Sequence, residues 1–306
     1  NESATLAAIV QGPNALSPVR HPQAARAGRD KALDRMLSLG WIDTAAVAAA
    51  KARSLGLKTS SPRRPAAVSL RSYLKRQAKS HAPQRFQKGR GVWIETTIDP
   101  VLQSRAETTV KTSLQALRKS YPKLASLDLN ASMVVVDGST GKILAHVGGD
   151  PAQTSDSFDR VSQAKRQPGS LVKPFLALEA YERCGSEAVL NPASRVSDAA
   201  ISIGSGATAW RPQNYDRKHH GAPLLHEALV HSYNIPFVRV ARHCGWEAMA
   251  DRVALAGLSL PLSPPPSFVL GAIEVTPLEI AEAYTTFSGR LGQRVRPVAF
   301  TNFQGS

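Results

Sequence analysis

Two serines in this sequence have neighbours at spacings that suit acyl-transfer chemistry. Ser170 is followed three residues later by Lys173, in the segment R-Q-P-G-S-L-V-K-P-F. Residues three apart share a face of a helix, so the Lys173 amine could take the proton of the Ser170 hydroxyl. Ser170 would then be a nucleophile and Lys173 its general base. The alternative is a helix-capping serine beside a solvated lysine.

The S-x-x-K spacing alone is weak, because it occurs five times: Ser72/Lys75, Ser120/Lys123, Ser139/Lys142, Ser162/Lys165 and Ser170/Lys173. Only the last pair has a distinctive context. Pro168-Gly169 predicts a turn, and an apolar helix follows over 171–183. Pro174 cannot donate a hydrogen bond to the carbonyl of Ser170, so Ser170 must lie where the helix starts. Helix N-termini favour an oxyanion and disfavour an ammonium, and burial would lower the pKa of Lys173.

A second motif is Ser232-Tyr233-Asn234, the only S-x-N in the chain. It lies between two predicted helices, and Pro236 follows it. Ser232 could relay a proton between Lys173 and a leaving group, while the Asn234 amide could hold a substrate amide. The alternative is a pair of helix-capping residues.

Hydrophobic periodicity and turn signals divide the chain into three parts. Residues 1–57 read as helical, with helices expected over 22–39 and from 44 to about 57. Residues 58–92 are turn-rich and basic and predict a linker with a short helical piece near 69–78. In the third part we expect a strand, a long helix, a hairpin and five helices, at 93–98, 101–120, 133–147, 170–184, 224–231, 235–243, 246–256 and 277–288. This order predicts an α+β domain with helices packed on an antiparallel sheet.

The net charge of +15 is concentrated near the start of the chain. Residues 1–92 carry 17 Lys and Arg against 4 Asp and Glu, whereas residues 93–306 carry 21 against 19. We therefore expect the basic region 1–92 to lie near anionic lipid headgroups. Aromatic residues are sparse there, which disfavours nucleic acid.

The two cysteines exclude a disulfide-rich scaffold and have no metal-ligand spacing. A bridge between Cys184 and Cys244 is possible, but we expect two free buried thiols. The sequence contains no run of 18 apolar residues, so it predicts no membrane span.

The sequence resembles the transpeptidase domain of class A penicillin-binding proteins across nearly all of residues 93–306. The resemblance rests on the nucleophile segment, the S-x-N segment S-Y-N-I-P-F-V-R-V-A, W-R-P-Q-N-Y-D at 210–216, L-G-A-I-E-V-T-P-L-E-I-A-E-A-Y at 270–284, I-E-T-T-I-D-P-V-L-Q at 94–103 and the hairpin segment 134–149. Segments 11–30 and 33–42 are similar to the last helices of that family's glycosyltransferase domain. Residues 1–57 are therefore interpreted as the tail of such a domain, 58–92 as a basic linker and 93–306 as a transpeptidase domain with the serine β-lactamase-like fold.

The resemblance implies a role for each motif residue. Ser170 would be acylated, Lys173 would activate it, Ser232 would relay protons and Asn234 would orient substrate. The family's third motif, K-T-G, is absent, since no K-[ST]-G occurs in the chain. We therefore expect residues 93–306 to lack the later strands of the sheet, and residues 1–306 to be inactive alone.

The implied function is peptidoglycan cross-linking on the outer face of the bacterial cytoplasmic membrane, within a bifunctional synthase. Ser170 would attack D-Ala-D-Ala stem peptides and would also be acylated by β-lactams, with no metal and no organic cofactor. The alternatives are a D,D-carboxypeptidase or β-lactam sensor, and a non-catalytic module whose basic segment binds an anionic surface or nucleic acid.

Overall fold

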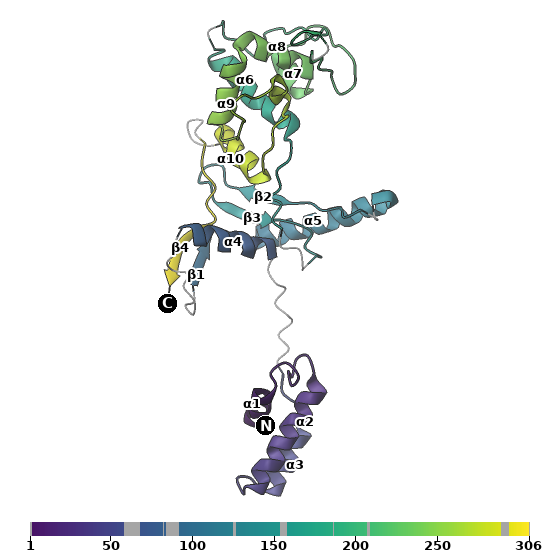
Figure 1. Cartoon of the computed structure of the whole chain (residues 1–306), viewed down its shortest axis with the longest axis vertical. Helices are drawn as coiled ribbons and strands as arrows, with labels where there is room; N and C mark the ends of the chain where they lie inside the picture. Colours follow the sequence, from purple (N-terminus) through teal and green to yellow (C-terminus); the bar gives the residue numbers. More distant parts are fainter. Residues whose placement is uncertain are drawn as a thin grey trace. The chain divides into compact units, whose positions relative to one another are not determined.

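The chain forms two compact units, residues 1–65 and 66–306. The computed structural model (Figure 1) describes residues 2–57, 68–81, 83, 92–124, 127–153, 158–185, 187–206, 209–288 and 294–305.

The first unit is helical, as predicted. It contains α1 (Glu2–Gln11), α2 (Pro22–Ser38) and α3 (Thr44–Ala52), and α2 packs against both other helices. Its small core is formed by Ala4, Leu33 and Val47. The prediction for α3 was too long, because Arg53 already takes an extended backbone conformation.

The sheets of the second unit are antiparallel and small. Strand β1 (Val92–Thr96) pairs with β4 (Phe300–Gly305), and β2 (Met133–Val136) forms the predicted hairpin with β3 (Ile143–Val147). The two pairs are connected, because Ile143 N–H donates to the carbonyl of Val298 at 2.9 Å. The predicted α+β architecture is therefore confirmed.

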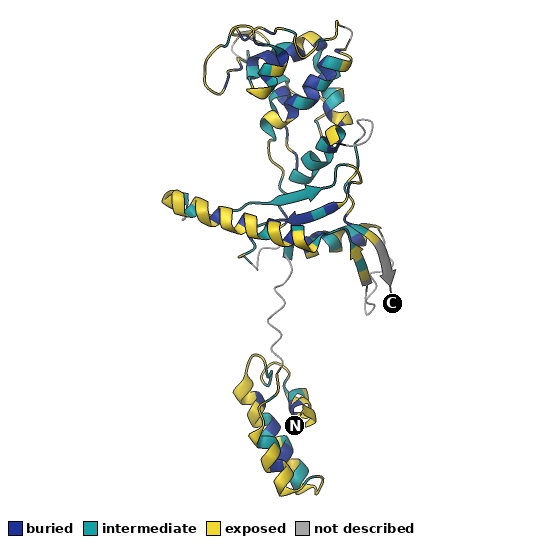
Figure 2. Ribbon diagram, turned by 180° about the vertical axis from the view of Figure 1, so that it is seen from behind, coloured by how far each residue is buried: buried dark blue, intermediate teal, exposed yellow. Residues whose placement is uncertain are grey.

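Helix α5 (Pro100–Ser120) lies on β3 and begins where Asp99 caps it. The Asp99 side chain accepts from the N–H groups of Val101 and Leu102. The inner side of α5 contributes Ala106, Val110 and Leu114 to a core shared with β3, and the outer side of this helix is exposed (Figure 2). No helix in the described ranges combines the length and hydropathy of a membrane span.

The predicted helical piece in the linker is α4 (Val68–His81), and it belongs to the second unit. Ser69 Oγ accepts from Gly148 N–H at 3.2 Å, the Tyr73 ring stacks on His146, and Arg76 pairs with Asp159 at 3.0 Å. Part of the segment expected as a linker is therefore packed on the sheet. Residues 58–67 and 84–91, which make up most of the remainder, lie outside the described residues.

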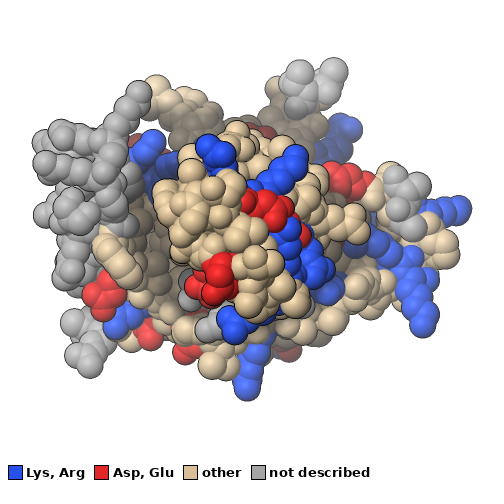
Figure 3. Space-filling model, turned by 90° about the horizontal axis from the view of Figure 1, so that it is seen from below, with Lys and Arg blue, Asp and Glu red and all other residues tan. Residues whose placement is uncertain are grey.

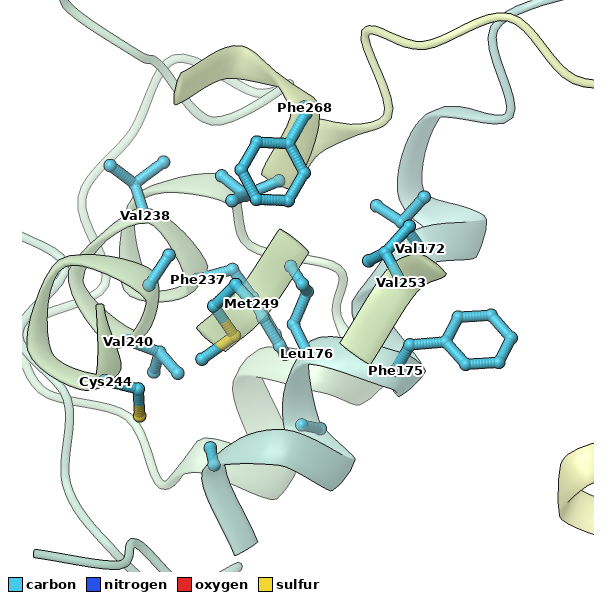
Figure 4. Close-up of a cluster of buried hydrophobic side chains, with 14 of the residues drawn as sticks. Val172, Phe175, Leu176, Phe237, Val238, Val240, Cys244, Met249, Val253 and Phe268 are labelled. Atoms are coloured by element: carbon cyan, nitrogen blue, oxygen red, sulfur yellow. The ribbon is translucent and has the colours of Figure 1, made fainter. Parts of the chain in front are cut away.

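Helices surround the largest core of the second unit, above the β2–β3 hairpin in the view of Figure 1. They are η3 (Gly169–Val172), α6 (Lys173–Glu182), α7 (Leu225–Val230), α8 (Asn234–Cys244), α9 (Trp246–Leu255), η5 (Pro266–Leu270) and α10 (Pro277–Ser288), close to the predicted ranges. Figure 4 shows apolar side chains of η3, α6, α8, α9 and η5 meeting in this core. Burial of these side chains holds α6 and α8 side by side.

The expectation of two free thiols was wrong, because Cys184 and Cys244 form a disulfide. The bridge joins the residue two positions after α6 to the last residue of α8. A Cβ on Gly185, whose φ is +59°, would lie only 2.3 Å from the carbonyl oxygen of Cys244. Glycine at position 185 therefore lets the ends of the two helices approach closely enough for the bridge. The two cysteines lie 60 residues apart in sequence, so their proximity could not be predicted from local patterns.

Candidate active site

The side chain of Lys173 is buried where α6 begins, and it links the two predicted motifs. Lys173 is only 1% exposed. Its Nζ donates to the Ser232 carbonyl at 2.6 Å, to Ser232 Oγ at 3.1 Å and to Asn234 Oδ1 at 2.8 Å. The S-x-x-K and S-x-N motifs, 59 residues apart in sequence, are therefore joined through one amine.

Burial separates this lysine from those of the other S-x-x-K matches. Lys75, Lys123, Lys142 and Lys165 are all exposed. The serines of two of these matches serve local structure, since Ser139 Oγ donates to Asp137 and Ser162 Oγ to Asp159. Among the lysines of the five matches, only Lys173 is buried.

The environment of Lys173 favours its neutral form. All three hydrogen-bond acceptors are uncharged, and the described residues place no carboxylate within ion-pair distance of Nζ. Its nearest aromatic neighbour is Phe237, with the ring centroid 5.7 Å from Nζ. Burial lowers the pKa of Lys173 from 10.5 to about 8, in the predicted direction. A fraction of the amine is therefore unprotonated near neutral pH and can accept a proton.

Ser170 lies at the helix start, as the position of Pro174 predicts. A 3₁₀ turn, η3, precedes α6, and the N–H of Lys173 donates to the carbonyl of Ser170. Proline cannot supply the α-helical bond to this carbonyl, so the tighter turn replaces it. Ser170 itself is exposed.

Packing from distant segments fixes the turn before Ser170. Gly271, at φ +77°, lies so close to Gly169 that an added Cβ would meet its backbone at 2.2 Å. Arg166 and Val275 exchange two backbone hydrogen bonds, and Tyr284 Oη donates to the carbonyl of Leu171. The segment 270–284, part of the family resemblance, thus holds the turn before Ser170.

A nucleophile and its general base are expected to lie within hydrogen-bond reach of each other, but a hydrogen bond between Ser170 and Lys173 is not formed. Among the described side chains, the structure shows none between Ser170 Oγ and Lys173 Nζ, because Nζ is directed to Ser232 and Asn234. Hydrogen bonds at catalytic residues are often long before substrate binds.

The S-x-N loop has a strained backbone at its serine. Ser232 has φ +57°, a left-handed conformation that non-glycine residues rarely adopt. Ser232 is exposed and Asn234 half-buried. Such strain persists only where the surroundings impose it, and it is concentrated at functional sites.

Residues without a predicted role hold this loop. The side-chain oxygen of Asn214 accepts from the backbone N–H of Asn234 at 2.8 Å, and Asp198, fully buried, accepts from the Asn214 amide. His220 binds the same carboxylate and stacks on Tyr233, with ring centroids 4.0 Å apart. The resemblance in W-R-P-Q-N-Y-D marked Asn214, but nothing in the sequence indicated its partners.

Comparison with known proteins places the chain in a family. Residues 131–302 match the penicillin binding protein transpeptidase domain. This chain belongs to that family. The Ser170, Lys173 and Ser232-x-Asn234 segments all lie inside the matched range of this penicillin-binding protein domain.

Relatives and solved structures agree with the family. The chain is 31% identical to penicillin-binding protein 1B of Vibrio cholerae over 293 residues, and 31% identical to penicillin-binding protein 1B of Escherichia coli over 296 residues. Each match covers 94% of this chain, and the chain spans 36% and 34% of the relatives' length.

Two solved structures share the fold. A crystal structure of penicillin-binding protein 1A from Haemophilus influenzae aligns with a TM-score of 0.78 and 20% identity, over 98% of this chain and 57% of the other. The PonA1 protein of Mycobacterium tuberculosis in complex with penicillin V aligns with a TM-score of 0.60 and 22% identity, over 78% of this chain and 63% of the other.

Proposed function

We propose that this penicillin-binding protein domain forms acyl-enzymes at Ser170, as a serine-type D,D-transpeptidase in peptidoglycan synthesis. The proposal rests on the buried Lys173, whose amine has only neutral partners and follows Ser170 by one helical turn. Lys173 is the general base, Ser232 the proton relay and Asn234 the residue that orients substrate.

The first step forms a bond between Ser170 Oγ and the carbonyl carbon of the penultimate D-Ala. The serine proton passes to the neutral amine of Lys173. Expulsion of the terminal D-Ala breaks the C–N bond, and its nitrogen takes a proton passed from Lys173 through Ser232 Oγ. The nitrogen of an amine on a neighbouring strand then forms an amide bond with the same carbonyl carbon, the ester C–Oγ bond breaks, and the proton lost by the amine passes through Lys173 to Ser170 Oγ.

The hydrogen bonds among the described residues leave one side-chain amide hydrogen of Asn234 for substrate. Its Oδ1 accepts from Lys173, and its Nδ2 donates to the Gln213 carbonyl at 2.8 Å. The second N–H hydrogen of this amide is the donor proposed to meet a carbonyl of the stem peptide or of a β-lactam side chain.

The deciding experiment labels residues 1–306, followed by a K-T-G strand segment of a family member, with a fluorescent penicillin and then maps the labelled peptide. We expect the label on Ser170 and no label in Ser170→Ala. Ser120→Ala, which alters another S-x-x-K serine, is the matched control and should label normally. Incubation with a D-Ala-D-Ala stem peptide and an acceptor amine then separates cross-linking from carboxypeptidase hydrolysis, and absence of labelling would support a non-catalytic module.

The missing K-T-G motif is proposed to slow acylation of residues 1–306 by themselves. In the family it supplies hydrogen bonds to substrate opposite the serine, and loss of one oxyanion-hole donor costs about 100- to 1,000-fold in rate. The test compares these residues alone with the same residues followed by a K-T-G strand segment of a family member. Equal labelling rates would show that the motif is dispensable.

The whole protein is proposed to be a bifunctional synthase that acts on the outer face of the cytoplasmic membrane, without metal or organic cofactor. Similarity to the two 1B proteins over 94% of the chain must include most of the first unit, which supports the interpretation as a glycosyltransferase tail.

The basic region is proposed to contact anionic lipid headgroups. On α4, Arg71, Lys75 and Lys79 are exposed at a spacing of four residues, and the helix contains no acidic residue. Basic side chains are prominent on the surface in Figure 3, with acidic ones among them. Binding to vesicles containing anionic lipid should weaken with salt and with substitution of these three residues by Gln. Equal binding to neutral vesicles would contradict the electrostatic interpretation.

A further inference from the structure

The side chain of Asn214 connects an irregular segment to the first residues of α8. It is 4% exposed. Its Oδ1 accepts from the backbone N–H of Asn234 at 2.8 Å and of Ile235 at 3.3 Å. N–H groups in the first turn of a helix have no helical carbonyl to bind, so Asn214 supplies the acceptor that they lack.

Asp198 determines which way the Asn214 amide faces. The Asn214 Nδ2 donates to both carboxylate oxygens of Asp198, at 2.9 and 2.8 Å, and to the carbonyl of Lys218 at 2.8 Å. Carboxylate and carbonyl oxygens only accept, so the NH₂ group must face them and Oδ1 must face α8.

The Asp198 carboxylate is itself held on its other side. It is fully buried and also accepts from the backbone N–H of His220 at 2.8 Å, while His220 Nδ1 lies 2.9 Å from it. A carboxylate with this many partners cannot turn easily, so the orientation that it imposes on Asn214 is firm.

Asn234 is consequently held from two directions by adjacent residues. Asn214 binds its backbone N–H, and the carbonyl of Gln213 binds its side-chain Nδ2 at 2.8 Å. The remaining polar atom of the amide, Oδ1, is then directed at Lys173 Nζ, 2.8 Å away. An unbroken series of hydrogen bonds runs from Asp198 through Asn214 and Asn234 to Lys173.

We propose that Asn214, oriented by Asp198, is a positioning residue for the acylation site. Its function is to hold the start of α8 so that the Asn234 amide keeps Lys173 Nζ beside Ser232. The expected effect on the acylation rate rests on the proposed function. The holding of the first turn of α8 by Asn214 does not.

Asn214→Leu is the principal variant, because leucine keeps much of the volume and removes every hydrogen bond. Asn191→Leu is the matched control: the Asn191 side chain also accepts a backbone N–H, that of Ala193 at 2.8 Å, but is not in contact with Lys173. We expect the rate of penicillin acylation to fall at least tenfold in Asn214→Leu and to stay unchanged in Asn191→Leu. The loss should lie in the acylation step rather than in penicillin affinity, and the pH profile of acylation should shift.

A charge exchange supplies the rescue test. Asn214→Asp alone sets two carboxylates against each other and should be as damaging as leucine. Asp198→Asn combined with Asn214→Asp restores one carboxylate and one amide, with the carboxylate now accepting from α8, and should recover part of the rate. No recovery would count against the hydrogen-bonded orientation.

Hydrogen exchange of the Asn234 and Ile235 amides tests the inference without any activity. Both amides should exchange faster in Asn214→Leu and remain protected in Asn191→Leu. Unchanged protection would overturn the proposal, as would faster exchange with an unaltered acylation rate. If the chain with the K-T-G strand added does not label at all, the proposed function fails, and the exchange measurement still decides the role of Asn214.

Discussion

The buried carboxylate of Asp159 and the buried amine of Lys173 lie in the same compact unit, but only the carboxylate meets opposite charge. Asp159 is fully buried between His146 at 2.8 Å and Arg76 at 3.0 Å. It also accepts hydrogen bonds from Ser162 Oγ and from the Val161 N–H. These contacts lower the pKa of Asp159 although burial acts in the opposite direction.

Lys173 is equally buried and has the reverse surroundings, with three neutral acceptors and no carboxylate among its described neighbours. A buried charge with an opposite charge beside it stays ionised and holds elements together, here α4 against β3. A buried amine without a counter-charge loses affinity for its proton, which a general base requires. The difference in partners distinguishes a structural group from a candidate catalytic one.

Of the changes that test this comparison, substitution of Lys173 should have the largest kinetic effect. In Lys173→Met we expect penicillin acylation to fall by about 100- to 10,000-fold, the usual contribution of a general base, while stability changes little. The measurements are labelling kinetics and urea denaturation, with Lys165→Met, at another S-x-x-K position, as the control. A variant that acylates normally would exclude Lys173 as the base.

Substitution of Asp159 should give the opposite result. Asp159→Asn leaves His146 and Arg76 without their carboxylate and should reduce the free energy of unfolding by about 3 kcal/mol. Urea denaturation measures it, and Asp251→Asn on the exposed side of α9 is the control. If the folded variant acylated penicillin far more slowly than the parent chain, the distinction between the two groups would fail.

The disulfide should contribute about 2–4 kcal/mol to the stability of the part that carries Lys173. It joins the far ends of α6 and α8, whose first residues are Lys173 and Asn234. We expect Cys184→Ser with Cys244→Ser to lower the midpoint of denaturation, as reduction should in the parent chain. An unchanged midpoint in both cases would show that packing alone aligns the helices.

The pH dependence should separate the two groups by sign. The pKa of Lys173 is about 8 in the folded chain against 10.5 as its ordinary value, so the unfolded state binds more protons between these pH values. The free energy of unfolding of the parent chain, measured relative to that of Lys173→Met, should therefore rise with pH across this window. The pKa of Asp159 is lowered, so its contribution is present above about pH 4 and is lost as pH falls through its folded-state pKa.

Acylation should follow the same titration of Lys173. Its rate should rise about tenfold per pH unit below 8 and level off above it, because only the neutral amine accepts the proton. Stopped-flow labelling between pH 6 and 10 measures this. A rate that is independent of pH would assign the base to another group.

Local sequence determined where the chemistry-bearing residues lie on their helices. Pro174 alone requires Ser170 to lie at a helix start, and the local pattern of residues 101–120 alone predicts α5. The S-x-N motif between two helices and the two apolar runs on either side of the Gly-containing turn of the hairpin were also sufficient for correct predictions. Each of these depends on interactions between residues a few positions apart, which a sequence displays directly.

Tertiary structure decided which lysine is buried and what surrounds it. Five serine–lysine pairs share the S-x-x-K spacing, and only packing of α6 against α8 encloses Lys173 beside Ser232, 59 residues away. The Cys184–Cys244 bridge, the contacts of α4 with β3 and the bonds from Asp198 to Asn214 likewise join distant segments. Burial and charge pairing depend on which distant segments are in contact. Local sequence patterns do not show which residues make those contacts.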